Sequence, residues 1–259
     1  MLDSQLTVKT STIGDNVFQT WKISYKSLCY LRWISWIYLV LGLLYLLIIE
    51  YPTVGKPFFY MTNWGHILGL IYFTLVLVYT HKYESQEKRE TGGHSLYKAI
   101  NIFCQITFSL ETLICIFFWT LLFGDVMTKN ANKPYPQNVE YIILNVILHA
   151  FSPLCIFLEV TFNMIPFDLR RGAFSVTVLT LVYTVVNYIG TLVLGYPIYK
   201  PISWNSFMTA VFLAIAYILC MGGFYLGYRL QKWKTYRNES LLEGLKNYEN
   251  ISDTHTTYQ

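Results

Sequence analysis

The chain has 259 residues, of which 54% are hydrophobic and only 13% charged, with a mean hydropathy of +0.38. A water-soluble domain carries about a quarter charged residues, so the composition excludes a soluble enzyme, a disordered chain and a nucleic-acid-binding protein. The net charge of +4 is too small to indicate an acidic partner, and the apolar side chains are expected to face membrane lipid.

Six apolar stretches are long enough to cross a membrane as helices. Crossing about 30 Å of hydrocarbon takes roughly 20 apolar helical residues, and a helix satisfies every backbone N–H and C=O inside lipid. The stretches are continuously apolar and do not alternate with a period of two, which excludes a transmembrane β-barrel. We therefore predict an all-α polytopic membrane protein with six transmembrane helices in one bundle. In chain order the expected spans are 29–49, 60–80, 99–124, 139–163, 174–198 and 205–230.

The basic residues predict how the chain is oriented in the membrane. The expected division is a polar N-terminal segment (1–28), the transmembrane domain (29–230) and a polar tail (231–259), which is expected to be a frayed helix. Fifteen of the 19 Lys and Arg residues lie at or near the two end segments and the 81–98 and 164–173 loops. Because cytosolic loops carry the excess of Lys and Arg, both termini are predicted to be cytosolic. Short outward loops without glycosylation sequons favour the endoplasmic reticulum membrane over the plasma membrane.

Motifs of soluble enzymes and of metal sites are missing from the sequence. There is no GxSxG, HExxH, Walker loop or GxGxxG motif, and no metal or soluble cofactor is expected. The five cysteines fall in apolar stretches without CxxC or His/Cys ligand spacing, so we expect neither a disulfide framework nor zinc. Gly223 and Gly227 fit a GxxxG pattern, which predicts close helix packing inside the bundle.

Away from the first and last four residues of each expected span, four ionisable side chains remain, where each costs about 2.5 kcal/mol or more and marks a functional hypothesis. They are His66, Glu111, His149 and Glu159. Glu159 is near the cytosolic end of the fourth span and is expected to snorkel to the surface or to pair with Arg170 or Arg171. His66 is near the outer start of the second span, where interfacial water could solvate it; a functional histidine is the alternative.

His149 is expected near the middle of the membrane, just before Ser152-Pro153. Pro153 lacks an N–H and leaves the carbonyl of His149 without its usual donor, which predicts a kink and a pocket wall. The imidazole can carry a proton near neutral pH, or it can be a buried neutral group bonded to a neighbouring helix. Glu111 has a similar depth on the third span. It is either a partner of His149 or a protonated acid bonded to a Thr or Tyr.

Short stretches spread over the transmembrane region, in matching order and spacing, carry a family resemblance. They are Tyr60-Met61-Thr62 before a helix ending in Ile71-Tyr72-Phe73, Phe118-Trp119 leading to Asp125, and Leu144-Asn145 followed by His149 and Glu159. These stretches resemble the six-span androgen-induced and androgen-dependent TFPI-regulating proteins. The Thr62-Asn63-Trp64 triplet and the run from Ile198 to Trp204 resemble the related rolling-stone proteins.

Some members of that family are threonine hydrolases that cleave fatty acid esters of hydroxy fatty acids with one Thr and one His. Carried over by position, the resemblance implies Thr62 as the nucleophile and His149 as its general base, with a membrane lipid ester as substrate. Glu111 has no counterpart in those members and is not carried over. The resemblance to the related rolling-stone proteins implies an alternative, a non-catalytic membrane protein that acts in adhesion, fusion or signalling. A third hypothesis is a proton-coupled carrier that uses Glu111 and His149.

The proposed pair makes a geometric demand on the fold. A Thr hydroxyl is a poor nucleophile until a neighbouring base takes its proton, and this requires a separation of about 2.6–3.2 Å. Thr62 is expected near the outer boundary and His149 deeper, so the second helix must begin before Thr62 or the fourth must be displaced outward. Otherwise Thr62 only caps its helix through its hydroxyl.

Overall fold

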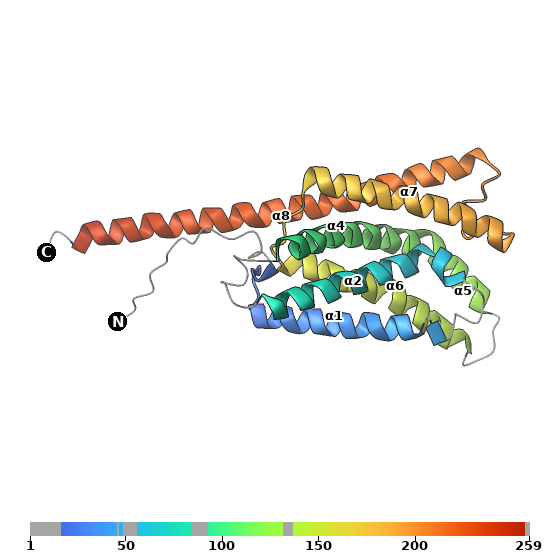
Figure 1. The fold of residues 1–259 in the computed structure, drawn as a ribbon, viewed down its shortest axis with the longest axis horizontal. Helices are drawn as coiled ribbons and strands as arrows, with labels where there is room; N and C mark the ends of the chain where they lie inside the picture. The colour runs from blue at the N-terminus through green and yellow to red at the C-terminus, as the bar shows by residue number, and fades with distance from the viewer. Residues whose placement is uncertain (1–16, 46, 49–55, 84–92, 132–136, 257–259) are drawn as a thin grey trace.

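A computed structural model describes residues 17–45, 47–48, 56–83, 93–131 and 137–256. Six of its helices are long and apolar enough to cross a membrane, and they pack side by side in one bundle (Figure 1). The predicted class, an all-α polytopic membrane protein, is therefore confirmed. The predicted N-terminal segment lies outside the described residues as far as residue 16. All five cysteines are free thiols.

The six long helices begin and end within about five residues of the expected spans, except that α4 ends seven residues early and the last helix continues far beyond its span. They are α1 (Tyr25–Tyr45), α2 (Met61–Lys82), α4 (His94–Phe117), α6 (Gln137–Phe162), α7 (Leu169–Leu194) and α8 (Phe207–Thr256). Three short elements complete the fold: the 3₁₀-helix η3 (Lys56–Phe59), one turn of π-helix η4 (Phe118–Leu122) and α5 (Phe123–Ala131). Helix α5 occupies residues that were expected to form a loop, because α4, η4 and α5 follow one another without a break in helical conformation.

Helix α8 is a single helix of 50 residues. It crosses the bundle and then continues far beyond it (Figure 1), so most of the predicted polar tail is an extension of the last span. No proline follows Pro201 in the sequence, and a proline is the residue that most strongly stops a helix.

Local sequence explains where α7 begins and ends. The carboxylate of Asp168 accepts hydrogen bonds from the backbone N–H groups of Arg170 (3.0 Å) and Arg171 (2.9 Å), which is the usual chemistry of a helix N-cap. Gly195 ends the helix with a φ of +72°, in the left-handed region that favours glycine. The chain then turns back into α8.

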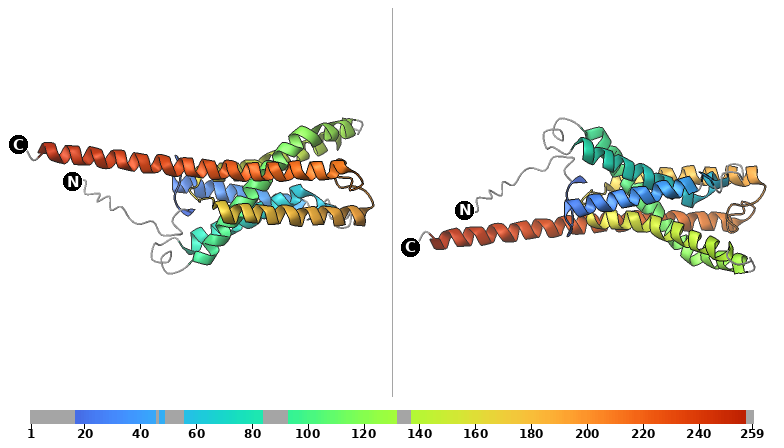
Figure 2. Two further views of the ribbon diagram at one scale, coloured as in Figure 1. Left: turned by 90° about the horizontal axis from the view of Figure 1, so that it is seen from above. Right: turned by 90° about the horizontal axis from the view of Figure 1, so that it is seen from below.

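The bundle has two distinct ends. Helix α1 begins, α6 ends, α7 begins and α8 leaves the bundle at one end, which we call the terminal end (Figures 1 and 2). The opposite end carries α5 and the connection between α7 and α8. Helix α4 and the first half of α6 run obliquely across the other helices (Figure 2).

A buried ion pair joins α1 to α6 near the terminal end. Glu159 receives hydrogen bonds from Arg32 Nη2 at 2.8 Å and Nε at 3.0 Å, and both side chains are 0% exposed. The Tyr72 hydroxyl on α2 donates to the same carboxylate at 2.9 Å. The predicted partners of Glu159, Arg170 and Arg171, are exposed side chains at the start of α7. That pairing, and the alternative that Glu159 snorkels to the surface, are both wrong because Arg32 supplies a cation inside the bundle.

A buried lysine attaches α8 to the same region. The Lys234 ammonium donates to the backbone carbonyls of Val160 (2.7 Å) and Asn163, which are among the carbonyls that a helix C-terminus leaves unpaired. The backbone N–H of Trp21 donates to the Phe162 carbonyl at 2.7 Å. The last turn of α6 is therefore closed by α8 and by the segment that precedes α1.

The GxxxG glycines of α8 face the bundle, as predicted. A Cβ atom added at Gly223 would lie 2.8 Å from the Cβ of Thr112 on α4, and one at Gly227 would lie 2.2 Å from the ring of Phe167. Contacts this short leave no room for a side chain at either position. The pattern therefore marks close packing of α8 against α4 and against the turn that leads into α7.

Candidate functional site: a cavity between the helices

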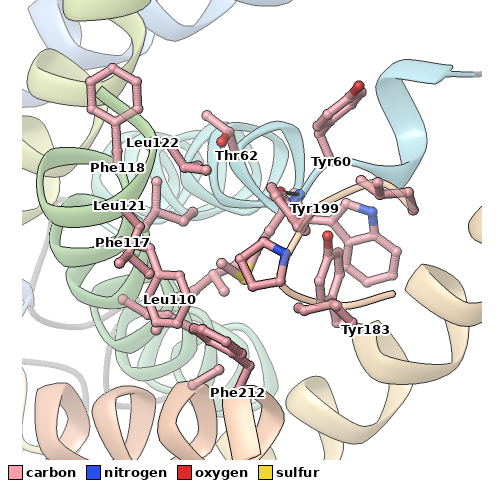
Figure 3. A pocket seen from close by; sticks show the side chains of 18 of the residues that line it. Tyr60, Thr62, Leu110, Phe117, Phe118, Leu121, Leu122, Tyr183, Tyr199 and Phe212 are labelled. Atoms are coloured by element: carbon pink, nitrogen blue, oxygen red, sulfur yellow. Dashed lines mark hydrogen bonds between the residues drawn. The ribbon is translucent and has the colours of Figure 1, made fainter. Parts of the chain in front are cut away.

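The helices enclose a cavity of about 690 Å³ at the end opposite the terminal end (Figure 3). We call this end the cavity end. Its wall comes from α2, α4, η4, α5, α6, α7, α8 and the connection before α8. Cavities of this size hold ligands of drug-like dimensions, and an apolar wall suits an acyl chain. The apolar wall includes Leu110, Leu113, Phe117, Phe118, Leu121 and Phe212.

Thr62 lines this cavity from the first turn of α2 (Figure 3). Helix α2 begins at Met61, and Tyr60 is its N-cap without any side-chain cap hydrogen bond. The interpretation of Thr62 as a helix cap is therefore wrong. No hydrogen bond among the described residues uses the Thr62 hydroxyl, so that hydroxyl is not committed to a structural contact.

Contacts with α7 fix the start of α2. The Tyr183 hydroxyl on α7 donates to the carbonyl of Phe59 at 2.8 Å, and the Trp64 indole donates to the carbonyl of Phe58 at 2.7 Å. Gly190 lets α7 approach closely, since a Cβ there would lie 2.6 Å from the ring of Phe59. The turn that carries Thr62 is therefore tied to η3 through Trp64, and η3 is tied to α7 through Phe59.

His149 lines the same cavity from α6. Its ring stacks on Phe118, with centroids 3.7 Å apart and planes 11° apart, and only 9% of the residue is exposed. Phe118 opens the π-helical turn η4, and single π turns in α-helices frequently occur at functional sites. Among the described residues, the buried Nδ1 of His149 has no hydrogen-bond partner. An unpaired buried nitrogen costs about 1–3 kcal/mol and is available to a bound molecule.

The fold meets part of the geometric demand: it brings Thr62 and His149 to one cavity, while among the described residues no hydrogen bond joins the two side chains. Helix α2 begins one residue before Thr62, and α6 crosses the bundle obliquely (Figure 2). Both side chains consequently reach one cavity, although their expected depths differ. Pro153 lies inside α6 without ending it, and the predicted pocket wall at His149 is confirmed.

Glu111 does not bond His149. Its carboxylate accepts a hydrogen bond from the Ser152 hydroxyl at 2.7 Å, and the side chain is 1% exposed. The carboxylate also lies against α2, because a Cβ added at Gly65 would be 2.7 Å from its Oε1. The sequence allowed a His149 pair or a bond to Thr or Tyr, and the structure instead shows a serine. Glu111 thus joins α4 to α6 and α2, about one helical turn from Thr62 and His149.

His66 belongs to the packing of α2 against α1. Its Nε2 lies 2.8 Å from the carbonyl oxygen of Leu39, and the residue is 2% exposed. A Cβ added at Gly42 would lie 2.5 Å from the ring. The expectation that interfacial water solvates His66 is therefore wrong, since α1 covers the ring.

The sequence analysis missed the polar residues that line the cavity from α7 and from the connection before α8. Tyr183 and Thr184 on α7 and Tyr199 in the following connection line the cavity. Tyrosines near the ends of transmembrane spans usually lie at the membrane–water interface. Sequence alone therefore does not distinguish them from tyrosines whose side chains point into the bundle. The only signal was the run from Ile198 to Trp204, which contains Tyr199.

These features define a multi-pass membrane protein whose helices enclose a largely apolar cavity lined by an imidazole and several hydroxyl groups. Residues 48–232 match the family described as FAR-17a/AIG1-like protein, and the chain belongs to this family. The chain is also 26% identical, over 194 residues, to Protein rolling stone of Drosophila melanogaster. This similarity covers 68% of the chain and 66% of that relative, so the chain spans slightly less than two thirds of the relative's length. No solved structure matches the chain.

Proposed function

We propose that the protein is an intramembrane threonine hydrolase of lipid esters, with fatty acid esters of hydroxy fatty acids as its substrate class. The observation that carries the proposal is that Thr62 and His149, from α2 and α6, line one cavity. The uncommitted hydroxyl of Thr62 and the unpaired Nδ1 of His149 support it. The resemblance to threonine hydrolases of the family supplies the substrate class.

In the proposed reaction His149 removes the proton of the Thr62 hydroxyl while Oγ1 attacks the ester carbonyl carbon. The bond from this carbon to the alcohol oxygen breaks, the alcohol takes the proton from His149, and the acyl group stays on Thr62. A water molecule, deprotonated by His149, then attacks the acyl carbon. The bond from this carbon to Thr62 Oγ1 breaks, Oγ1 takes the proton back from His149, and the fatty acid leaves. Stacking on Phe118 holds the plane of the imidazole during both steps. No metal or soluble cofactor enters these steps.

Hydrolysis of a lipid ester by the purified protein in detergent tests this proposal. Thr62→Ala and His149→Ala should each lower kcat roughly 100-fold or more, because each removes a group that acts in the transition state. Thr74→Ala and His81→Gln are matched controls. Thr74 lies on the same helix and donates to its own Leu70 carbonyl at 2.7 Å, and His81 is exposed. Unchanged activity in both site variants would refute the proposal.

Covalent labelling provides a second test that needs no natural substrate. A fluorophosphonate probe with an alkyl chain should form an adduct on Thr62, located by mass spectrometry of the digested protein. Labelling should disappear in Thr62→Ala and become slow in His149→Ala, since the base activates the hydroxyl. An adduct on another residue would contradict the assigned nucleophile.

The similarity to Protein rolling stone favours a second candidate, a non-catalytic membrane protein in adhesion, fusion or signalling. A folded sample, with a cooperative thermal transition but neither ester hydrolysis nor labelling, would support this candidate. We also propose that both termini lie in the cytosol, in accordance with the distribution of the Lys and Arg residues, and that the protein resides in the endoplasmic reticulum membrane, in accordance with its short outward loops without glycosylation sequons.

A further inference from the structure

The start of α2 presents a backbone donor at the cavity wall. No side chain caps this helix, and the first N–H groups of a helix have no partner within it. The N–H of Asn63 bonds the Tyr60 carbonyl at 3.1 Å, and the N–H of Met61 bonds Tyr199. Among the described residues, the N–H of Thr62 has no acceptor. It carries part of the positive charge of the helix dipole and belongs to the residue assigned as nucleophile.

A phenol lies directly beside this donor. Tyr199 lines the cavity from the connection before α8 (Figure 3), and its oxygen accepts the N–H of Met61 at 3.0 Å. Accepting this bond leaves the phenol's own proton for another acceptor. The neighbouring phenol of Tyr183 has committed its proton to the Phe59 carbonyl, so the Tyr199 proton goes to the Tyr183 oxygen or to a molecule in the cavity. Burial raises the pKa of the Tyr199 phenol above its usual value, which keeps that proton on the oxygen.

Tyr199 is held in place before any ligand binds. The edge of its ring meets the ring of Tyr60, with centroids 6.1 Å apart and planes at 90°. The N–H of Ile202 donates to the Tyr199 carbonyl at 2.8 Å, and the Ile198 and Ile202 side chains that flank this turn are each 8% exposed. A donor fixed in this way needs no reorganisation at the moment of reaction. The buried, unpaired Nδ1 of His149 on the same cavity independently indicates that a polar ligand group binds here.

We propose that the backbone N–H of Thr62 and the phenol of Tyr199 form an oxyanion hole, which makes Tyr199 a further catalytic residue. This inference rests on the proposed hydrolase function. As Thr62 Oγ1 bonds the acyl carbon, the electron pair of the C=O double bond moves to the carbonyl oxygen, which accepts the two hydrogen bonds. When the double bond re-forms, the bond to the alcohol breaks and the alcohol leaves with the proton held by His149. The phenol keeps its proton throughout.

A substitution that removes only the hydroxyl group of Tyr199 tests the oxyanion hole. Tyr199→Phe keeps the ring, and kcat for ester hydrolysis should fall roughly 100-fold with little change in KM, as for the loss of one oxyanion donor in other hydrolases. Tyr188→Phe is the matched control, because Tyr188 is exposed on α7 and packs on Trp204 outside the cavity. A kcat of Tyr199→Phe equal to that of the unmodified protein, with Thr62→Ala inactive, would overturn the oxyanion hole and leave the hydrolase function standing. Full activity of Thr62→Ala would overturn both.

Inhibitor binding separates a catalytic phenol from a merely structural one. A lipid trifluoromethyl ketone forms an oxyanion on Thr62, whereas the corresponding alkyl ether occupies the cavity without forming a charge. Tyr199→Phe should weaken binding of the ketone roughly 100-fold and leave binding of the ether unchanged. An equal loss for both ligands, or no loss for the ketone, would refute the assignment.

Discussion

At the residue scale, Arg32 and Glu159 show what a membrane protein needs in order to keep a charged pair inside. The guanidinium bonds both carboxylate oxygens, and its Nη1 donates to the Val17 carbonyl at 3.0 Å. The carboxylate also receives the hydroxyl of Tyr72 and the amide of Asn163. Each charge is therefore compensated, and the cost of removing both from water is offset only while the whole set is present.

Removing either member of this pair should be strongly destabilising. Arg32→Ala or Glu159→Gln leaves the partner charge buried without its counterion, and we expect the free energy of unfolding to fall by about 3–5 kcal/mol. Unfolding of the purified protein in mixed micelles, followed by tryptophan fluorescence, measures this change. Arg171→Ala is the control, because Arg171 is 70% exposed and lies 3.9 Å from Asp168, and exposed pairs contribute about 1 kcal/mol or less. Equal effects of Arg32→Ala and Arg171→Ala would contradict this account.

Sequence reasoning identified the charged residues inside the bundle more reliably than their partners. Hydropathy singled out Glu159 and His149, because an ionisable group in an apolar stretch is conspicuous. The partner of Glu159 was missed because Arg32, near the start of the first expected span, was one of the fifteen basic residues assigned to the cytosolic side. Glu159 lies 127 residues further along the chain, and such pairing depends on which faces of α1 and α6 meet. Thr62 and His149 were matched through the family resemblance, and not through their expected depths.

At the element scale, two adjacent glycines in α8 offer a direct measurement of helix packing. Gly223 faces Thr112 on α4, whereas a Cβ added at Gly222 would meet nothing within 4 Å. The two positions share one helix and differ by one residue in sequence. They therefore separate the contribution of packing from the intrinsic helix preference of glycine.

Gly223→Ala should lower the thermal transition temperature, and Gly222→Ala should leave it unchanged or raise it. At Gly223 the new methyl group forces α8 away from α4, and overpacking of this kind typically costs about 1–3 kcal/mol. At Gly222 alanine only restricts the unfolded chain and favours the helix. Thermal melting of both purified variants, followed by size-exclusion chromatography, measures the difference. Transition temperatures that fall equally would show that the α4–α8 contact is looser than described.

The transmembrane helices were predictable, because contact with lipid requires long stretches of apolar residues. Six continuous apolar stretches gave six helices, because burial in hydrocarbon leaves a strong compositional signal. Helix α5 was not predicted, and the polar tail was expected to be a frayed helix and not an unbroken extension of the last span. Polar sequence carries no such compositional signal, and helix continuation there depends on the neighbouring turns. The π turn η4 was equally invisible, although it places Phe118 against His149.

At the scale of the whole molecule, an even number of crossings brings both ends of the described chain to the terminal end (Figure 1). Exposed basic side chains of α7 and α8 lie at this end too: Arg170 and Arg171 at the start of α7, and Arg229 and Arg237 on either side of Lys234 in α8. Because cytosolic loops carry the excess of Lys and Arg, we propose that this end faces the cytosol and the cavity end faces the lumen.

Epitope tags at the two termini test this orientation. In cells whose plasma membrane alone is permeabilised, antibodies should reach both tags, because both are expected in the cytosol. A lumenal resident protein, inaccessible under the same conditions, is the control. If both tags were detected only after the internal membranes are also opened, the orientation would be the reverse of the proposed one. If one tag were detected before this step and the other only after it, the number of spans would be odd and one span would have been miscounted.

The continuity of α8 connects two regions that the sequence treats as unrelated. Phe212 and Leu213 border the cavity, Lys234 is anchored to the end of α6, and the same helix runs on to Thr256 outside the bundle. Between the cavity and Lys234 the same helix packs closely on Thr112 at Gly223 and on Phe167 at Gly227, so the segment that borders the cavity and the anchored segment are one unbroken, tightly packed helix. A force on the part of α8 beyond Lys234 would therefore act first on residues packed against α4 and α6, and only then on Phe212 at the cavity, about 33 Å from Lys234 by the helical rise of about 1.5 Å per residue.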